Sequence, residues 1–141
     1  MEGPRPPFPS EYASLARLVD TVFNPENPGG MFKYFQPLFN ADNRENLLVT
    51  VDGGEVVSHV GMTQRWAVLD GCTVRVACLG AVATYERYRG QGLASKLFAV
   101  ACDKARADGV DFMLISGDRP LYLAAGATFV RRDHSAFVGP E

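Results

Sequence analysis

The sequence lacks the features that mark several large protein classes. Its 141 residues contain no apolar run approaching the roughly 20 residues of a membrane-spanning helix, and the N-terminus has no apolar signal-peptide core. We therefore expect a cytoplasmic protein without membrane contact. The formal net charge of -2 provides no general attraction to nucleic acid, so any anion site must be a local concentration of positive potential.

Cysteine is scarce as well. The three cysteines, Cys72, Cys78 and Cys102, are odd in number and lack the spacing of metal ligands. Cys72 and Cys78 fall on the same side of one expected strand, where a disulfide between them is geometrically implausible. We expect reduced, mostly buried thiols and no metal site.

The composition is that of one ordinary globular domain, with 47% hydrophobic and 21% charged residues. Four prolines restrict residues 1–9 to an extended arm or a weak edge strand, and we expect a single domain over residues 10–141. Hydrophobic periodicity predicts helices over residues 10–23, 31–39 (kinked or ended early at Pro37), 93–107 and 121–125, and strands over residues 46–51, 55–66, 72–84, 110–115 and 127–132.

The order of these elements predicts a mixed α/β (α+β) fold. Three successive strands joined by short glycine turns form an antiparallel meander. The helix over residues 93–107 then connects two strands as a β-α-β crossover, so the strands over residues 72–84 and 110–115 should be parallel. Residues 134–138 are either a further strand or a continuation of the strand before them.

Residues 82–95 form the stretch with the clearest chemical character. An apolar strand leads into a turn that carries Gly90 and Gly92 beside Arg87 and Arg89, and a helix starts immediately afterwards. This layout directs free backbone N–H groups and the positive end of the helix dipole at one place, which favours binding of a phosphate. The P-loop pattern and the dinucleotide pattern Gly-x-Gly-x-x-Gly are both absent, so those two phosphate sites are excluded.

Arg87-x-x-Gly90-x-Gly92 resembles the Arg/Gln-x-x-Gly-x-Gly/Ala signature of the GNAT superfamily of N-acetyltransferases. The element order over residues 10–132 is similar too. The resemblance implies a mixed, mostly antiparallel sheet flanked by helices, and acetyl-coenzyme A as the acyl donor. It further implies that the loop holds the coenzyme's pyrophosphate and that the strand before the loop pairs with the pantetheine amides. The implied cofactor-binding residues are Gly80, Ala81, Val82, Arg87, Tyr88, Arg89, Gly90, Gln91 and Gly92, to which the hydroxyl of Ser95 could add a donor.

A second family feature is a tyrosine on the short helix that follows the next strand. The pattern here begins with Leu121-Tyr122 and ends with Gly126-Ala127, where the family usually has phenylalanine in the last position. The resemblance implies that Tyr122 protonates the departing thiolate, because a phenol with a pKa near 10 is matched to a thiolate with a pKa of about 8.5.

The general base is less defined by the sequence. Many family members use a carboxylate on the strand before the motif, but residues 74–83 contain no Asp or Glu. His59 is the substitute that we predict, because histidine titrates near neutral pH. His134, Asp118 and a chain of water molecules are the alternatives.

Family members generally close the acceptor side with two C-terminal strands, but only nine residues follow Arg132 here, so the second strand would be short or supplied otherwise. A compact variant, a homodimer that completes the sheet, and the N-terminal domain of a longer protein each explain this. The loop before Tyr122 resembles multidomain relatives of the enhanced-intracellular-survival type. We predict an N-acetyltransferase for a small-molecule or peptide amine; the alternative is a non-catalytic module that binds acyl-coenzyme A.

Overall fold

The computed structural model describes residues 1–130 of the 141. Its centre is a five-stranded sheet in which the strand order follows the chain order. The first three pairs of neighbouring strands are antiparallel, and the last pair is parallel. The strands are β1 (Glu2–Arg5), β2 (Leu47–Asp52), β3 (Glu55–Leu69), β4 (Cys72–Thr84) and β5 (Phe112–Ile115).

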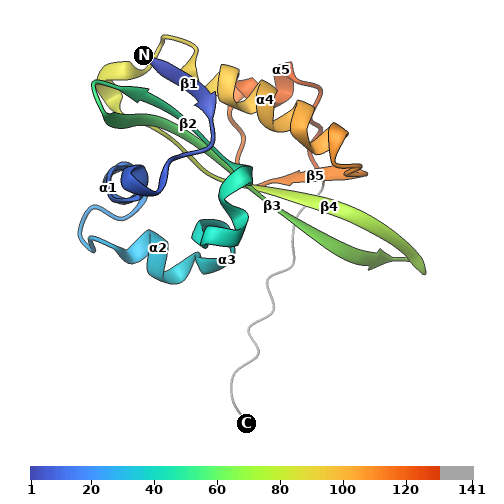
Figure 1. The fold of residues 1–141 in the computed structure, drawn as a ribbon. Coiled ribbons are helices and arrows are strands. Elements are labelled where there is room, and N and C mark those ends of the chain that lie inside the picture. The colour runs from blue at the N-terminus through green and yellow to red at the C-terminus, as the bar shows by residue number, and fades with distance from the viewer. Residues whose placement is uncertain (131–141) are drawn as a thin grey trace.

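Helices cover both faces of this sheet (Figure 1). One face carries α1 (Tyr12–Phe23), α2 (Gly30–Tyr34) and α3 (Gln36–Phe39). The opposite face carries α4 (Leu93–Ala107) and α5 (Pro120–Ala124). Three short 3₁₀ turns complete the fold: η1 (Pro9–Glu11), η2 (Ala41–Asn46) and η3 (Glu86–Tyr88).

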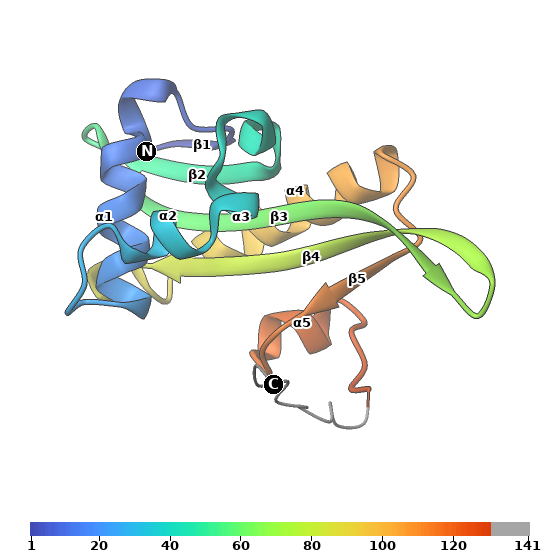
Figure 2. The same ribbon diagram turned by 90° about the horizontal axis from the view of Figure 1, so that it is seen from below.

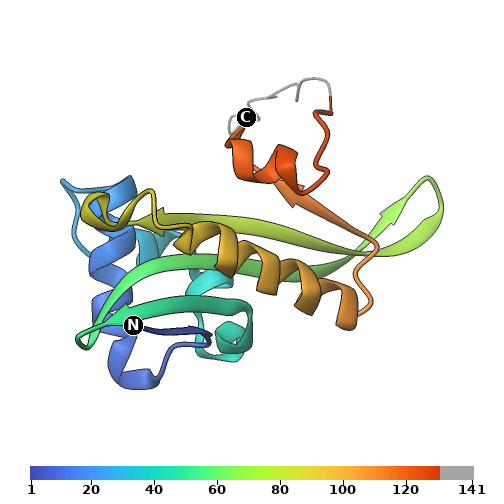
Figure 3. The same ribbon diagram turned by 90° about the horizontal axis from the view of Figure 1, so that it is seen from above.

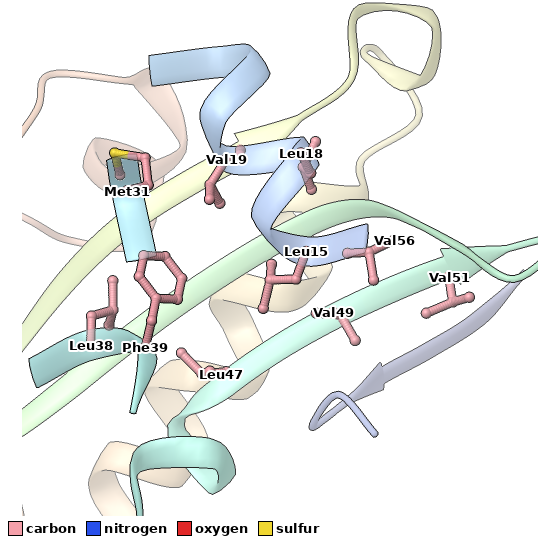
Figure 4. Close-up of a cluster of buried hydrophobic side chains, with 11 residues drawn as sticks. Leu15, Leu18, Val19, Met31, Leu38, Phe39, Leu47, Val49, Val51 and Val56 are labelled. Carbon is pink, nitrogen blue, oxygen red and sulfur yellow. The ribbon is translucent and has the colours of Figure 1, made fainter. Parts of the chain in front are cut away.

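The core beneath α1 fixes the first face (Figure 4). Leu15, Leu18 and Val19 recur at helical spacing on α1 and are fully buried. They pack with Val49 of β2 and Val56 of β3. The carboxylate of Asp20 accepts hydrogen bonds from the backbone N–H groups of Gly29 (2.6 Å) and Met31 (3.0 Å). Asp20 therefore ties the start of α2 to α1.

On the opposite face, α4 presents a second apolar stripe to the sheet. Leu97, Phe98 and Ala101 are buried against Val60 of β3 and Val82 of β4. The ring of Phe98 also packs edge-on to Tyr122 of α5, with ring centroids 5.3 Å apart. This packing holds α4 and α5 together on the same face.

The strands β4 and β5 diverge toward their carboxyl ends (Figure 2). The pairing covers Val76–Leu79 of β4 and Phe112–Ile115 of β5. Beyond Leu79, β4 continues to Thr84 without a partner on that side. At the other end, the β3–β4 hairpin extends past the rest of the sheet (Figure 3). The unpaired segment of β4 is thus a free sheet edge inside the molecule.

The predicted fold class and element order are confirmed, including the β-α-β crossover and the parallel pair. The second predicted helix is interrupted at Phe35 and forms α2 and α3. The last predicted strand, over residues 127–132, is wrong in its described part, because residues 127–130 have no regular secondary structure. Phe129 and Val130 are exposed, and no strand within residues 1–130 pairs with them. Arg131, Arg132 and the predicted segment 134–138 lie outside the described residues.

Candidate functional site

A cleft of about 290 Å³ opens where β4 and β5 separate. Its floor is Leu79, Gly80, Ala81 and Val82 of β4, and its far wall is Ser116, Arg119 and Tyr122. The near wall consists of the apolar side chains Phe23, Met31, Phe35 and Leu38, which come from α1, α2 and α3 and the chain between them. Arg119 is the one charged side chain among the described residues that line the cleft.

The floor of the cleft has an irregular backbone. In the β3–β4 register, Gly61 pairs with Gly80 and His59 pairs with Ala83, so Ala81 and Val82 together stand opposite Val60. This is a β-bulge, with one extra residue on β4. Ala81 has a φ of 51°, in the left-handed region that residues with a Cβ rarely adopt. The bulge re-aims the backbone at the point where β4 loses its neighbour.

The glycine loop continues directly from this strand. Gly90 and Gly92 have φ values of 78° and 72°, and Gly92 immediately precedes α4. The N–H groups of residues 90–95 have no hydrogen-bond acceptor within the described part of the chain. These six successive donors lie at the positive end of the α4 dipole, so the loop can bind an anion. The exposed side chain of Ser95 lies in the first turn of α4.

The other predicted loop residues have a different arrangement. The N–H groups of Tyr88 and Arg89 donate to the carbonyls of Tyr85 and Glu86 within the η3 turn, so they are not available to a ligand. The predicted donor set therefore shifts toward the helix, from residues 88–92 to residues 90–95.

Arg87 points away from these donors. Its guanidinium forms an ion pair with Glu55 at 2.5 Å and lies over the rings of Tyr85 and Tyr88. The hydroxyl of Tyr88 donates to Asp52 at 2.9 Å. Both acidic residues flank the β2–β3 turn. These contacts attach η3 to that turn. They could not be predicted from the sequence, because no local pattern indicates that Arg87 and Glu55, which lie far apart in the chain, form a pair.

Tyr122 lies in the far wall, across the cleft from the bulge. Its side chain is 4% exposed, and burial raises the pKa of its phenol above the ordinary value of 10. The phenol therefore keeps its proton at neutral pH and can donate it. Tyr122 thus brings a protonated phenol to the wall of the cleft, and its role as general acid stays a prediction.

His59 is absent from the lining of the cleft. Its side chain is fully buried beneath the bulge, and its Nδ1 forms a hydrogen bond of 2.7 Å with the carbonyl oxygen of Ala81. Burial lowers the pKa of the imidazole from 6.5 to about 4. An enclosed imidazole has no open path to an amine in the cleft, so this position disfavours the predicted role of general base.

Three further features complete the description of the surface and its possible ligands. Among residues 1–130, no group of three or more His, Cys, Asp or Glu side chains is placed to hold a metal ion. Within the same residues, no helix is both long enough and apolar enough to cross a membrane. A groove of about 350 Å³ between α4 and α5 begins at Ser95, beside the glycine loop.

Comparison with known proteins gives one family match. The model for the acetyltransferase (GNAT) domain matches residues 4–129. A search of curated protein sequences gave no match.

Solved structures give many matches to the fold. An acetyltransferase from Trypanosoma brucei has a TM-score of 0.72 and 18% identity, with 95% of this chain and 97% of that chain covered. A GCN5-related N-acetyltransferase from Ralstonia eutropha has a TM-score of 0.74 and 15% identity, with 96% and 97% covered. A GNAT family acetyltransferase from Brucella melitensis, in complex with acetyl-coenzyme A, has a TM-score of 0.64 and 18% identity, with 86% and 79% covered.

Proposed function

Because this chain belongs to the GNAT acetyltransferase family, we propose that it transfers an acetyl group from acetyl-coenzyme A to a primary amine. The observation that carries the proposal is one cleft and an anion-binding loop joined by the same strand. The unpaired edge of β4 and the phenol of Tyr122 line the cleft where β4 and β5 separate. The loop of residues 90–95, with its free N–H groups, follows the carboxyl end of β4.

The residues present fit acetyl-coenzyme A. Its pyrophosphate needs several hydrogen-bond donors in a small space, and the N–H groups of residues 90–95 are such donors. Its pantetheine arm carries two amides, which match an unpaired strand edge such as residues 80–84 of β4. The coenzyme supplies a thioester, whose carbonyl carbon is open to attack by an amine.

The roles of the protein groups follow from their positions. The backbone N–H groups at the bulge are donors that can polarise the thioester carbonyl. The phenol of Tyr122 gives its proton to the sulfur as the thiolate leaves, and its raised pKa keeps that proton in place until then. Among residues 1–130, no carboxylate lines the cleft and His59 is enclosed, so we propose that the ammonium group of the acceptor loses its proton to solvent.

The near wall suggests which acceptors are favoured. Phe23 and Phe35 are both about half exposed, at 45% and 51%, beside the buried Met31 and Leu38. Burying these apolar surfaces is favourable only if the acceptor carries an apolar group of its own. A polycation finds no carboxylate to pair with in the part of the lining that residues 1–130 form. We therefore expect amines with an apolar or aromatic substituent to be better acceptors than polyamines.

The test has two stages. Calorimetric titration of the full chain with acetyl-coenzyme A comes first and should show binding at one site. A thiol-release assay then measures turnover over a panel of aromatic amines, aliphatic amines, amino acids and polyamines.

The outcomes separate the two candidate functions. Binding followed by amine-dependent thiol release supports the enzyme. Binding without release by any amine supports a module that only binds acyl-coenzyme A, a candidate favoured by the absence of a carboxylate among the described residues that line the cleft. Absence of binding contradicts both.

A further inference from the structure

The buried side chain of His59 has an unusual set of contacts. It reaches from β3 to the bulge on β4, and its Nδ1 lies 2.7 Å from the carbonyl oxygen of Ala81. A carbonyl accepts and cannot donate, so Nδ1 must carry the proton. The other ring nitrogen, Nε2, has no hydrogen-bond partner among the described residues. The imidazole is thus a neutral donor with a defined tautomer.

The bulge needs a donor at this place. Ala81 and Val82 have no one-to-one partner on β3, because only Val60 stands opposite them. A bulge interrupts the regular hydrogen bonds of the ladder, and a buried carbonyl left without a donor is costly. The side chain of His59 supplies this carbonyl with a donor.

The packing around the ring leaves it little freedom. A Cβ added to Gly61 would lie 2.9 Å from Cε1 of His59 and 2.9 Å from Cδ1 of Leu38. Glycine at position 61 therefore makes room for the imidazole and for a residue of the cleft wall. The ring of Phe39 packs on the same imidazole, with centroids 5.8 Å apart. These contacts hold the ring in the orientation that reaches Ala81.

We propose that His59 is a positioning residue for acetyl transfer. Its Nδ1–H holds the Ala81 carbonyl, which fixes the left-handed backbone of Ala81 and so aims the backbone groups of residues 80–82 along the cleft. His59 thus acts through the bulge and does not touch the amine or the thioester. The effect on transfer rests on the proposed function; the hydrogen bond does not.

The first experiment observes the hydrogen bond directly. Imidazole ¹⁵N shifts of the full chain, measured by NMR between pH 5 and 8, should show His59 as a non-titrating Nδ1–H tautomer. An Nε2–H tautomer, or titration near pH 6.5, would overturn the proposal. The readout needs neither coenzyme nor acceptor. Failure of the hydrogen bond is thus distinguishable from failure of the proposed function, which would appear as a wild-type chain without amine-dependent turnover.

The second experiment compares two variants of nearly equal shape. His59→Asn keeps an N–H donor at the position of Nδ1, whereas His59→Leu replaces it with a methyl group. We expect His59→Leu to lower kcat about tenfold or more, with the Kd for acetyl-coenzyme A changed less than threefold, because small misplacement of reacting groups affects rate more than binding. His59→Asn should recover kcat to within about threefold of the wild type, with an unchanged pH profile.

Three further results complete the test. Ala81→Gly places a glycine, which accepts a positive φ without strain, at the bulge. In the double variant it should reduce the loss of kcat caused by His59→Leu, and it should help the His59→Leu chain to fold. Val56→Ala, at another fully buried position of β3, controls for general loss of stability and should leave kcat unchanged. If His59→Asn were as inactive as His59→Leu and both recovered at high pH, His59 would be the general base, and the positioning role would be wrong.

Discussion

At the scale of single residues, the anion site depends on backbone conformation more than on side chains. Gly90 and Gly92 both have positive φ, and a Cβ at either position would meet no heavy atom within 4 Å. The space above them is therefore open, and a left-handed backbone is what requires glycine. A large side chain at position 90 would fit the protein but would cover the N–H donors.

We therefore predict that Gly90→Trp abolishes binding of acetyl-coenzyme A, because the indole blocks the approach of the pyrophosphate to residues 90–95. Calorimetric titration measures the affinity. Gly71→Trp is the matched control: Gly71 has a φ of 80° and equally open surroundings, but it lies in the β3–β4 turn. Both variants should lose about 1–2 kcal/mol of stability through the strained φ, and only Gly90→Trp should lose the coenzyme. Unchanged affinity would place the pyrophosphate elsewhere.

Tyr122 gives a second prediction at this scale. Tyr122→Phe removes the acidic proton and keeps the ring that packs on Phe98. We expect kcat to fall about 10²-fold, the lower end of the usual contribution of general acid catalysis, with little change in coenzyme affinity.

The pH profile provides the sharper measurement. Burial raises the pKa of Tyr122, so the protonated acid persists to pH values above 10, and wild-type kcat should decline only beyond that point. The Tyr122→Phe variant should lack this decline. Tyr34→Phe, which alters an exposed phenol outside the cleft lining, is the control. Equal turnover of Tyr122→Phe and wild type would exclude Tyr122 as the acid.

At the scale of elements, the β2–β3 turn supports the glycine loop from outside. Glu55 pairs with Arg87, and Asp52 accepts from Tyr88, so two acidic residues of one turn hold two adjacent residues of the η3 segment that precedes the donors. Arg87 is 58% exposed in its side chain. Solvent screens such a pair, so its role concerns the position of the loop more than the stability of the fold.

This arrangement predicts that Glu55→Gln and Arg87→Gln weaken coenzyme binding to a similar extent, and that the double variant is no weaker than either single one. Titration at low and high salt measures the effect, which should shrink at high salt. Glu45→Gln, which breaks the exposed pair with Arg44 away from the loop, is the control. A much larger loss for Arg87→Gln than for Glu55→Gln would show that Arg87 contacts phosphate directly.

At the scale of the whole molecule, His59 couples stability to pH. The imidazole has a pKa of about 4 in the fold and its ordinary value of 6.5 in the unfolded chain, so the unfolded chain binds a proton that the folded chain excludes. No contribution arises above pH 6.5, where both states are neutral. Between pH 6.5 and about 4, stability falls as the pH falls, by about 3 kcal/mol in total.

We predict this slope in urea unfolding measured from pH 7.5 to pH 4, and its absence in His59→Asn. The carboxylate of Glu11, whose pKa Arg5 lowers, also loses stabilisation in acid, but only below the ordinary carboxyl pKa of 4.5. The interval between pH 4.5 and 6.5 thus reports on His59 with little contribution from that carboxylate. A wild-type chain of constant stability in this interval would contradict the buried, neutral imidazole.

The sequence by itself determined the order of the elements and the location of the anion site. Helical and alternating periodicities, glycine turns and the Arg87-x-x-Gly90-x-Gly92 spacing are local patterns. Local patterns set secondary structure and the left-handed turn before α4, because both depend on residues a few positions apart. Tyr122 was found in the same way, through its place in a short motif.

Only the tertiary structure decided which groups meet. The pairing of Arg87 with Glu55 and the burial of His59 against Ala81 join residues 32 and 22 positions apart. The bulge and the unpaired edge of β4 follow from how whole strands align and separate. No local pattern encodes such contacts, because they arise from the packing of distant segments. For that reason the glycine loop before α4 was readable from the sequence, whereas the partner of each charged or titratable side chain was not.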